Sequence, residues 1–445
     1  MPSPTTYYDD ARVALSRWRK GILGALWVTY AAFYLCRVNL AAAQGQLARD
    51  RGVSKNQLGL MLALLKSFYA TGQLVNGVLA DHLRPRRMIA IGLTGSALLN
   101  LVFSHLDSYP WMAAVWALNG YLQALGWTPI VRILANWFPP RLRDVSSGAI
   151  GTAYILGSGL SWLLSGYATG EHGWRYAFWI PGWVCLAVVG LFLLVVREGP
   201  GDLGLPDEEG EAATAGGAGE QEMPLVTVLR SLASPWLWMV ALGSTCLCFG
   251  WHGLLDWTPH FLAEAGGCSA EEAARKAFLL PLGGAIGCAL LTYLARRTRR
   301  SLPWWVVPAP LLVLAVLTYN FPALMERMPG LLPLGLMALG MFSAGPAALI
   351  ACAMPTNIAG SASAGTAAGL VDAMGYVGSA TSGWASGHIM DRVGQVRGSA
   401  AAWRTVWHLW PVGMVAAAIL TGIAGRHNQF CAVEPSEAVP PATSE

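Results

Sequence analysis

A succession of apolar segments, each long enough to cross a lipid bilayer, constrains this chain more than any other feature. A membrane-spanning helix needs about 20 consecutive, mostly apolar residues. Of the 445 residues, 54% are hydrophobic and only 12% are charged. We expect twelve such segments, centred near Tyr30, Ala70, Thr94, Gln123, Leu156, Leu186, Cys248, Gly284, Val313, Ser343, Val377 and Val415. The sequence therefore predicts an all-α integral membrane protein with twelve transmembrane helices.

A hydrophilic segment divides the predicted helices into two groups of six. Residues 198–234 are rich in glycine, alanine, proline and acidic residues, a composition typical of a flexible, solvated linker. We expect an N-terminal six-helix bundle over residues 1–197, the linker over 198–234, a C-terminal six-helix bundle over 235–426 and a disordered tail over 427–445.

Basic residues in the loops set the expected orientation, because lysine and arginine are more frequent in cytoplasmic loops. They are more frequent here in the loops on the side of the N-terminus, which include Arg84, Arg86, Arg87 and the cluster at 296–300. This bias predicts a multi-pass protein of the inner (plasma) membrane whose linker and both termini are cytoplasmic. The net charge is only +4 and the basic clusters are short, which argues against a nucleic-acid partner.

Two pairs of similar segments indicate that the two halves are related. "GVLADHLRPRR" begins at Gly77 and "GCALLTYLARR" begins at Gly287, and in both the glycine is followed nine and ten residues later by paired arginines. "GWRYAFW" from Gly173 opens the sixth predicted span, and "AWRTVWHLW" from Ala402 opens the twelfth. Two related six-helix bundles are an architecture of alternating-access transporters.

An arginine interrupts the first apolar segment. Arg37 would cost at least ~2.5 kcal/mol in the hydrocarbon core, so we expect it to have a compensating use. If it faces a central cavity, its guanidinium offers a fork of donors suited to phosphate or carboxylate. Tyr30 and Tyr34 lie on the same helix face. The alternative is an arginine that snorkels to the outer surface.

Polar residues at helical spacing mark one face of two further spans. In a membrane such faces normally look inward, although they can serve only for hydrogen bonds between helices. The second span carries Lys66, Tyr69, Gln73 and Asn76 in this way, and the fifth carries Tyr154, Ser158, Ser161 and Ser165.

Four segments resemble the organophosphate:phosphate antiporters of the major facilitator superfamily, which include glycerol-3-phosphate and hexose-phosphate transporters and a related sensor. They are "YAAFYLCRVN" at Tyr30, "GWTPIVRILANWF" at Gly126, "GLLDWTPHFL" at Gly253 and "AGTAAGLVDAMGYVGS" at Ala364. The resemblance implies the major facilitator fold, and it implies that Arg37 matches the first-span arginine that binds the substrate phosphate.

The segment "GVLADHLRPRR" resembles the loop signature of the same superfamily. The resemblance implies that Asp81 pairs with nearby arginines, such as Arg86 and Arg87, or with helix ends, and so latches one conformation. The alternative is a charged loop that serves topology only. Arg132 matches an arginine in the family pattern, and for it we favour a structural or gating role over contact with the substrate.

Three positions depart from the family pattern. Trp251 stands where a second arginine, on the seventh span, would complete a clamp around phosphate. Tyr154 replaces a histidine of the fifth span, and Asp372 stands where a small neutral residue is expected in the eleventh. Without the second arginine, exchange against inorganic phosphate is in doubt.

Two further polar residues lie four positions apart on the seventh span. His252 and Asp256 have a spacing that suits a hydrogen-bonded pair. The family also has aspartate at the position of Asp256, so we expect an architectural role for it.

Asp372 needs a partner or a proton at its depth in the membrane. It shares a helix face with Tyr376 and is expected to point toward the cavity. Three uses compete, namely an ion pair with Lys66 or Arg37, a proton-carrying group, and a ligand for a cationic part of the substrate. An incidental position is the remaining alternative.

These residues predict a secondary active transporter that moves a small organic anion, a phosphorylated or phosphonate metabolite, by alternating access. Protons or inorganic phosphate are the candidate coupling ions. The alternatives are a proton-coupled transporter of a carboxylate or zwitterionic metabolite, and a membrane sensor that has lost transport. An enzyme is not expected, because the chain has no nucleophile beside a base, metal-ligand set or nucleotide loop. We expect a monomer without cofactor or metal.

Overall fold

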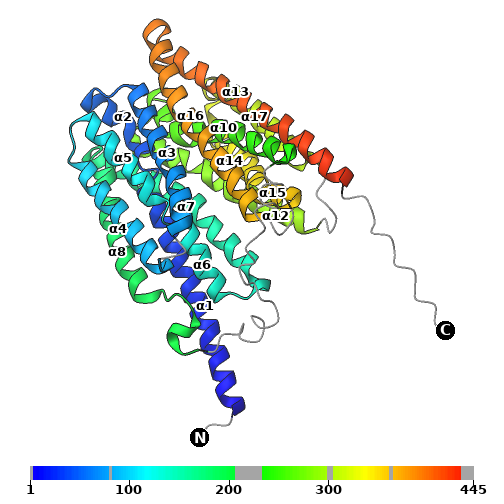
Figure 1. Cartoon of the computed structure of the whole chain (residues 1–445). Helices are drawn as coiled ribbons and strands as arrows, with labels where there is room; N and C mark the ends of the chain where they lie inside the picture. Colours follow the sequence, from blue (N-terminus) through cyan, green and yellow to red (C-terminus); the bar gives the residue numbers. More distant parts are fainter. Residues whose placement is uncertain (1–3, 80–82, 206–232, 298–303, 360–363, 432–445) are drawn as a thin grey trace, which may run out of the picture.

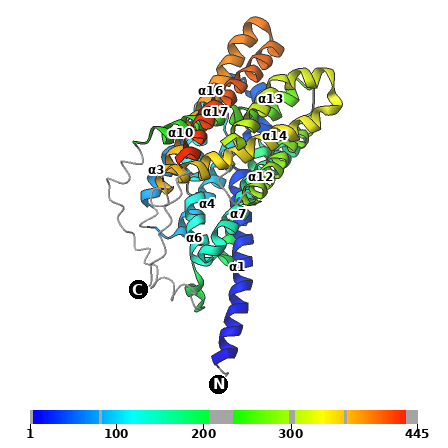
Figure 2. The same ribbon diagram turned by 90° about the vertical axis from the view of Figure 1, so that its right-hand side faces the viewer.

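The computed structural model describes residues 4–79, 83–205, 233–297, 304–359 and 364–431. Over these ranges the chain forms helices and no strands. Figures 1 and 2 show two helical bundles side by side, with the first part of the N-terminal helix extending beyond the rest at one end. The predicted all-α fold is confirmed.

The first half consists of six spans, two of which are interrupted. Its helices are α1 (Pro4–Leu35), α2 (Leu40–Arg51), α3 (Lys55–Leu79), α4 (Pro85–Ser104), α5 (Tyr109–Gln123), α6 (Trp127–Trp137), α7 (Pro140–His172) and α8 (Tyr176–Val195), and a 3₁₀ turn, η1 (Pro200–Leu203), follows. Helices α1 and α2 together make the first span, and α5 and α6 make the fourth.

The second half repeats this arrangement. Its elements are α10 (Pro235–Glu264), α11 (Ala270–Ala277), α12 (Leu279–Arg297), η2 (Trp304–Val306), α13 (Pro308–Arg327), η3 (Pro329–Leu331), α14 (Leu332–Ala348), the π-helical turn η4 (Leu349–Ala353), α15 (Met354–Ala359), α16 (Ala364–Arg397) and α17 (Ser399–Cys431). The tenth span is interrupted by the π-helical turn.

Length and apolar composition alone identify eight spans among the described residues. The other four, α3, the pair α5 and α6, α7 and α16, are short pieces or carry buried polar side chains. Lys66 in α3 and the serines of α7 lower the hydropathy of helices that other helices shield from lipid. Length and apolar composition alone therefore miss four of the twelve predicted spans.

Equivalent ion pairs connect helix ends in each half at the face opposite the linker. Arg175, just before the sixth span, pairs with Asp107 in the loop after the third. Arg404, at the start of the twelfth span, pairs with Glu326 at the end of the ninth, with 2.7 Å between Nη2 and Oε1. The repeated tryptophan-arginine segments thus make the same contact in each half, which supports the predicted pseudo-symmetry.

Glycines allow the halves to approach closely where α3 crosses α16. A Cβ added to Gly59 would lie 2.3 Å from the carbonyl oxygen of Gly383, and one added to Gly387 would lie 2.2 Å from that of Lys55. Small residues permit such backbone contact between membrane helices. Any side chain at these positions would push the halves apart.

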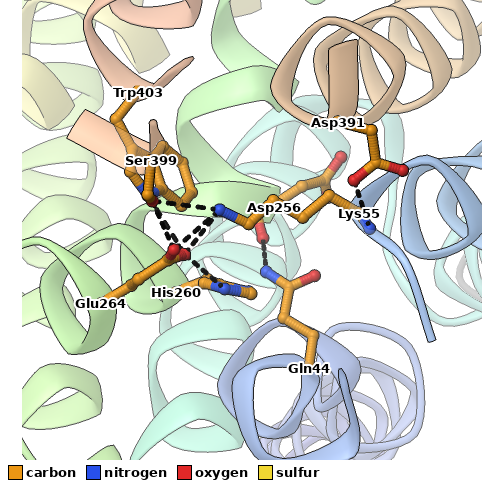
Figure 3. A network of polar contacts seen from close by, with 8 residues as sticks. All are labelled: Gln44, Lys55, Asp256, His260, Glu264, Asp391, Ser399 and Trp403. Atoms are coloured by element: carbon orange, nitrogen blue, oxygen red, sulfur yellow. Dashed lines mark hydrogen bonds and ion pairs between the residues drawn. The ribbon is translucent and has the colours of Figure 1, made fainter. Parts of the chain in front are cut away.

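A polar network joins the halves at the face opposite the linker. Lys55 begins α3, and its Nζ lies 2.8 Å from Oε2 of Glu264 at the end of α10. The backbone N–H of Lys55 donates to Oδ1 of Asp391 in α16 at 3.0 Å. Trp403 of α17 donates its indole N–H to Glu264 at 3.1 Å. Figure 3 shows these contacts converging between the two halves.

Candidate functional site

Arg37 lies in a break of the first span, between the end of α1 and the start of α2. Its half-buried guanidinium donates from Nε to Oε1 of Gln123 at 3.0 Å and from Nη1 to the hydroxyl of Tyr34 at 3.1 Å. Nη2 donates to the backbone oxygen of Gln123 at 3.5 Å. The sequence predicted an arginine inside the span but did not predict the break.

Buried amides stabilise this break by binding carbonyl oxygens near it. Asn119 donates to the carbonyl oxygen of Cys36 at 2.8 Å, and Asn100 donates to the same oxygen at 3.2 Å. Gln123 donates to the carbonyl oxygen of Phe33 at 2.9 Å. A broken helix is tolerated at membrane depth when neighbouring side chains satisfy the backbone in this way. These amides therefore fix the position from which Arg37 projects.

Tyrosines from four helices gather around the Arg37 guanidinium. Its Cζ lies 4.6 Å from the ring centre of Tyr34 and 4.3 Å from that of Tyr69 in α3. The ring of Tyr34 lies 5.9 Å from that of Tyr154 in α7. Tyr376, on α16 of the second half, packs against Tyr69 with 4.6 Å between ring centres. The structure thus brings five of the predicted site residues together.

Lys66 forms an ion pair with Asp256, which belongs to α10 of the other half. Both residues are buried, with 7% and 8% of their surface exposed. Lys66 also donates to the carbonyl oxygen of Ser379 at 3.4 Å. Since Lys66 already has a carboxylate partner, it does not supply the ion pair that was one of the expected uses of Asp372.

The expected hydrogen bond between His252 and Asp256 is not found. The carboxylate of Asp256 binds Lys66 instead, because a buried carboxylate gains more from an ammonium than from a neutral imidazole. His252 is half-buried on α10 and makes no hydrogen bond with the residues that the structure describes.

Trp251 is buried and lies with Tyr154 in the lining of a small pocket between the halves. Ser158 of α7, Pro281 of α12 and Ala344 of α14 line the same pocket. The two aromatic residues that were expected to replace an arginine and a histidine of the family pattern therefore line the same pocket. This part of the site offers apolar contact rather than charge.

Asp372 lies one helical turn before Tyr376 on α16. Its side chain is exposed, and Tyr376 on the same helix packs against Tyr69 of the first half. Within the described part of the chain, Asp372 makes no hydrogen bond or ion pair.

The structure describes three of the four predicted gating residues. Asp81 lies outside the described residues, so its latch stays a prediction. Arg86 donates to the carbonyl oxygen of Leu193 in α8, and Arg87 is exposed. Arg132 is exposed on α6. None of these three arginines contacts the tyrosines around Arg37 in a described interaction.

Comparison with known proteins places this geometry in a family. The model of the Major Facilitator Superfamily matches residues 26–383. The chain is 30% identical over 404 residues to the glycerol-3-phosphate transporter of Bacillus subtilis (strain 168). This alignment covers 86% of this chain and 89% of the transporter. It is 28% identical over 393 residues to a probable hexose phosphate transport protein of Chlamydia pneumoniae, covering 84% and 86% of the two chains.

A sensor and a solved transporter are also similar. The membrane sensor protein UhpC of Escherichia coli (strain K12) is 26% identical over 436 residues, covering 95% of this chain and 94% of the sensor. A bacterial homologue of the human lysosomal transporter Spinster, solved in an inward-facing and unoccupied conformation, superposes with a TM-score of 0.76 at 18% identity. That match covers 95% of this chain and 99% of the other. The chain therefore belongs to the major facilitator superfamily and, within it, to the organophosphate:phosphate antiporter family.

Proposed function

We propose that this protein is a secondary active transporter of the inner membrane that moves a small phosphorylated organic anion by alternating access. The proposal rests on the hydrogen-bond donors and the charge of Arg37 that remain available to a ligand. Three of the five N–H groups of a guanidinium are used by Gln123 and Tyr34, which leaves two for an anion. Among the described residues no carboxylate forms an ion pair with Arg37, so its charge is available to a substrate.

The partners of Arg37 suit this role. Gln123 and Tyr34 orient the guanidinium without neutralising it, which prepares it for a bidentate contact with phosphate. The faces of Tyr34 and Tyr69 stabilise the cation. The named relatives that carry glycerol 3-phosphate or hexose phosphate point to a phosphate monoester as the anion.

The polar network around Glu264 supports the alternating-access part of the proposal. It joins α3 of the first half to α10, α16 and α17 of the second at the face opposite the linker. With the linker in the cytoplasm, this is the closed outer face of an inward-facing state. Opening that face requires Glu264 and Asp391 to release Lys55.

A membrane sensor is the second candidate, because the similarity to the sensor UhpC covers 95% of the chain. A sensor and a transporter share the binding site and differ in flux. Only a transporter exchanges labelled ligand across a sealed membrane at a rate that depends on the protein.

The direct test of binding is the thermal stability of the purified, full-length protein with phosphate monoesters. A ligand that binds only the native state raises its stability by mass action. We expect glycerol 3-phosphate or another small phosphate monoester to raise the unfolding temperature, and glycerol to leave it unchanged. If no phosphate monoester in the millimolar range stabilises the protein, the proposed ligand class is wrong.

A further inference from the structure

Arg37 and Asp372 carry opposite charges on opposite halves of the protein, and neither has an ion-pair partner among the described residues. Arg37 lies in the break of the first span, and Asp372 lies in α16. The nearby Lys66 and Asp256 neutralise each other. Among the described residues of the site, one cation on the first half and one anion on the second therefore remain for a ligand.

Two stacked tyrosines connect these charges. The Arg37 guanidinium lies against the ring of Tyr69, and Tyr69 packs on Tyr376. Asp372 stands one helical turn from Tyr376 on the same helix. A ligand that lies along this tyrosine pair would therefore have Arg37 at one end and Asp372 at the other.

We propose that the site takes a zwitterionic phosphate monoester, with the phosphate on Arg37 and a primary ammonium group on Asp372. This inference rests on the proposed function, because it adds a second contact to the same anion site. Asp372 alone would repel the anionic ligands that Arg37 attracts, unless the ligand also carries a positive charge. The faces of Tyr69 and Tyr376 add favourable contact for that ammonium group, since aromatic faces attract cations.

The position of Asp372 also favours a ligand contact over a structural one. A carboxylate that held helices together would be buried and hydrogen-bonded, as Asp256 is with Lys66. Asp372 is instead exposed. A ligand that enters the space beside Asp372 can desolvate the carboxylate and form a charge-assisted hydrogen bond with it.

Two probes of nearly equal shape test the inference. 2-Aminoethyl phosphate carries an ammonium group where propyl phosphate carries a methyl group, and affinities for purified full-length protein can be measured by calorimetry. We expect 2-aminoethyl phosphate to bind about tenfold more tightly, the difference typical of one charge-assisted hydrogen bond. Asp372→Asn should abolish this preference and leave the affinity for propyl phosphate within about threefold, whereas Asp372→Glu should retain part of the preference.

The matched control is Glu326→Gln, which removes an exposed carboxylate from the outer ion pair with Arg404. It should change neither affinity. Equal binding of both probes by the unaltered protein would overturn the inference and leave the proposed function standing. An equal gain for both probes in Asp372→Asn would also overturn it, because the carboxylate would then only repel phosphate. Failure of both probes to bind any variant would instead contradict the proposed function itself.

Discussion

Lys66 and Asp256 form a buried ion pair that connects α3 of the first half with α10 of the second. The pair lies inside the membrane-spanning part of the protein, where an unpaired charge is costly. Among the described residues, Arg37 and Asp372 have no ion-pair partner of their own. Because Lys66 and Asp256 neutralise each other, the charges of Arg37 and Asp372 determine the electrostatics of the site.

Removing one member of the pair should destabilise the protein. Lys66→Met would strand the Asp256 carboxylate, and breaking a buried pair from one side costs about 3–5 kcal/mol. We expect a clearly lower unfolding temperature for Lys66→Met. The double variant Lys66→Met, Asp256→Leu should recover much of the loss, because no stranded charge remains. A double variant as unstable as the single one would show that the pair is not the cause.

Weakening the outer network should shift the protein away from the described state. Lys55→Met removes the ammonium group that pairs with Glu264 and keeps the backbone N–H groups of residues Lys55 and Asn56 that donate to Asp391. Partly exposed ion pairs contribute up to about 1 kcal/mol, so the population of the open outer face should rise by roughly fivefold. Spin labels placed on the outer ends of α3 and α16 would report this as a longer distance.

The matched control for this shift is Arg404→Gln. It breaks an exposed ion pair of the same kind, with Glu326, that lies within the second half. It should leave the label distances unchanged. Equal shifts in both variants would mean that the outer network is not a gate.

Gln123→Glu tests whether the positive charge of Arg37 must be unpaired for the substrate to bind, because this change keeps the contact that orients the guanidinium. The new carboxylate would keep the contact with Arg37 Nε but neutralise the guanidinium, so it would compete with the substrate phosphate. We expect at least a tenfold loss of affinity for glycerol 3-phosphate, with the fold preserved as judged by circular dichroism. Unchanged affinity would place the anion site away from Arg37.

Inorganic phosphate should be a weak competitor. The second half presents Trp251 instead of a second arginine, and Tyr154 of the first half lines the same pocket. An aromatic surface supplies contact area but no charge. We expect inorganic phosphate to displace glycerol 3-phosphate only at concentrations at least tenfold higher than an organic phosphate monoester needs. Competition by inorganic phosphate at equal concentration would indicate a second cation at the site.

The fold could be predicted from the sequence because membrane spans have a strong signal in length and hydropathy. The break at Arg37 could not, because it depends on Asn100, Asn119 and Gln123, which lie in other spans and bind carbonyl oxygens near it. The only sign of the break in the sequence was the presence of amide side chains inside apolar segments. Such side chains indicate that buried hydrogen bonds exist, but they do not indicate which backbone groups are bound.

The site was predictable where residues share a helix face with Arg37, as Tyr34 does. Pairing across the two halves was not, because helical spacing carries no information about contacts between α3, α10 and α16. For this reason the sequence suggested His252 as the partner of Asp256, whereas the partner is Lys66. Resemblance to the family identified Trp251 and Asp372 as departures without indicating what surrounds them.

Counterflow in proteoliposomes tests the central claim most directly, because it measures transport and the role of Arg37 together. Vesicles would be loaded with both unlabelled esters, glycerol 3-phosphate and 2-aminoethyl phosphate. One of the two esters would then be added outside in labelled form, in separate experiments. We expect the unaltered protein to accumulate label, and Arg37→Lys to retain less than about a tenth of that rate, because lysine keeps the charge but loses the bidentate geometry. Accumulation at the unaltered rate by Arg37→Lys, or no accumulation of either ester by the unaltered protein, would contradict the account.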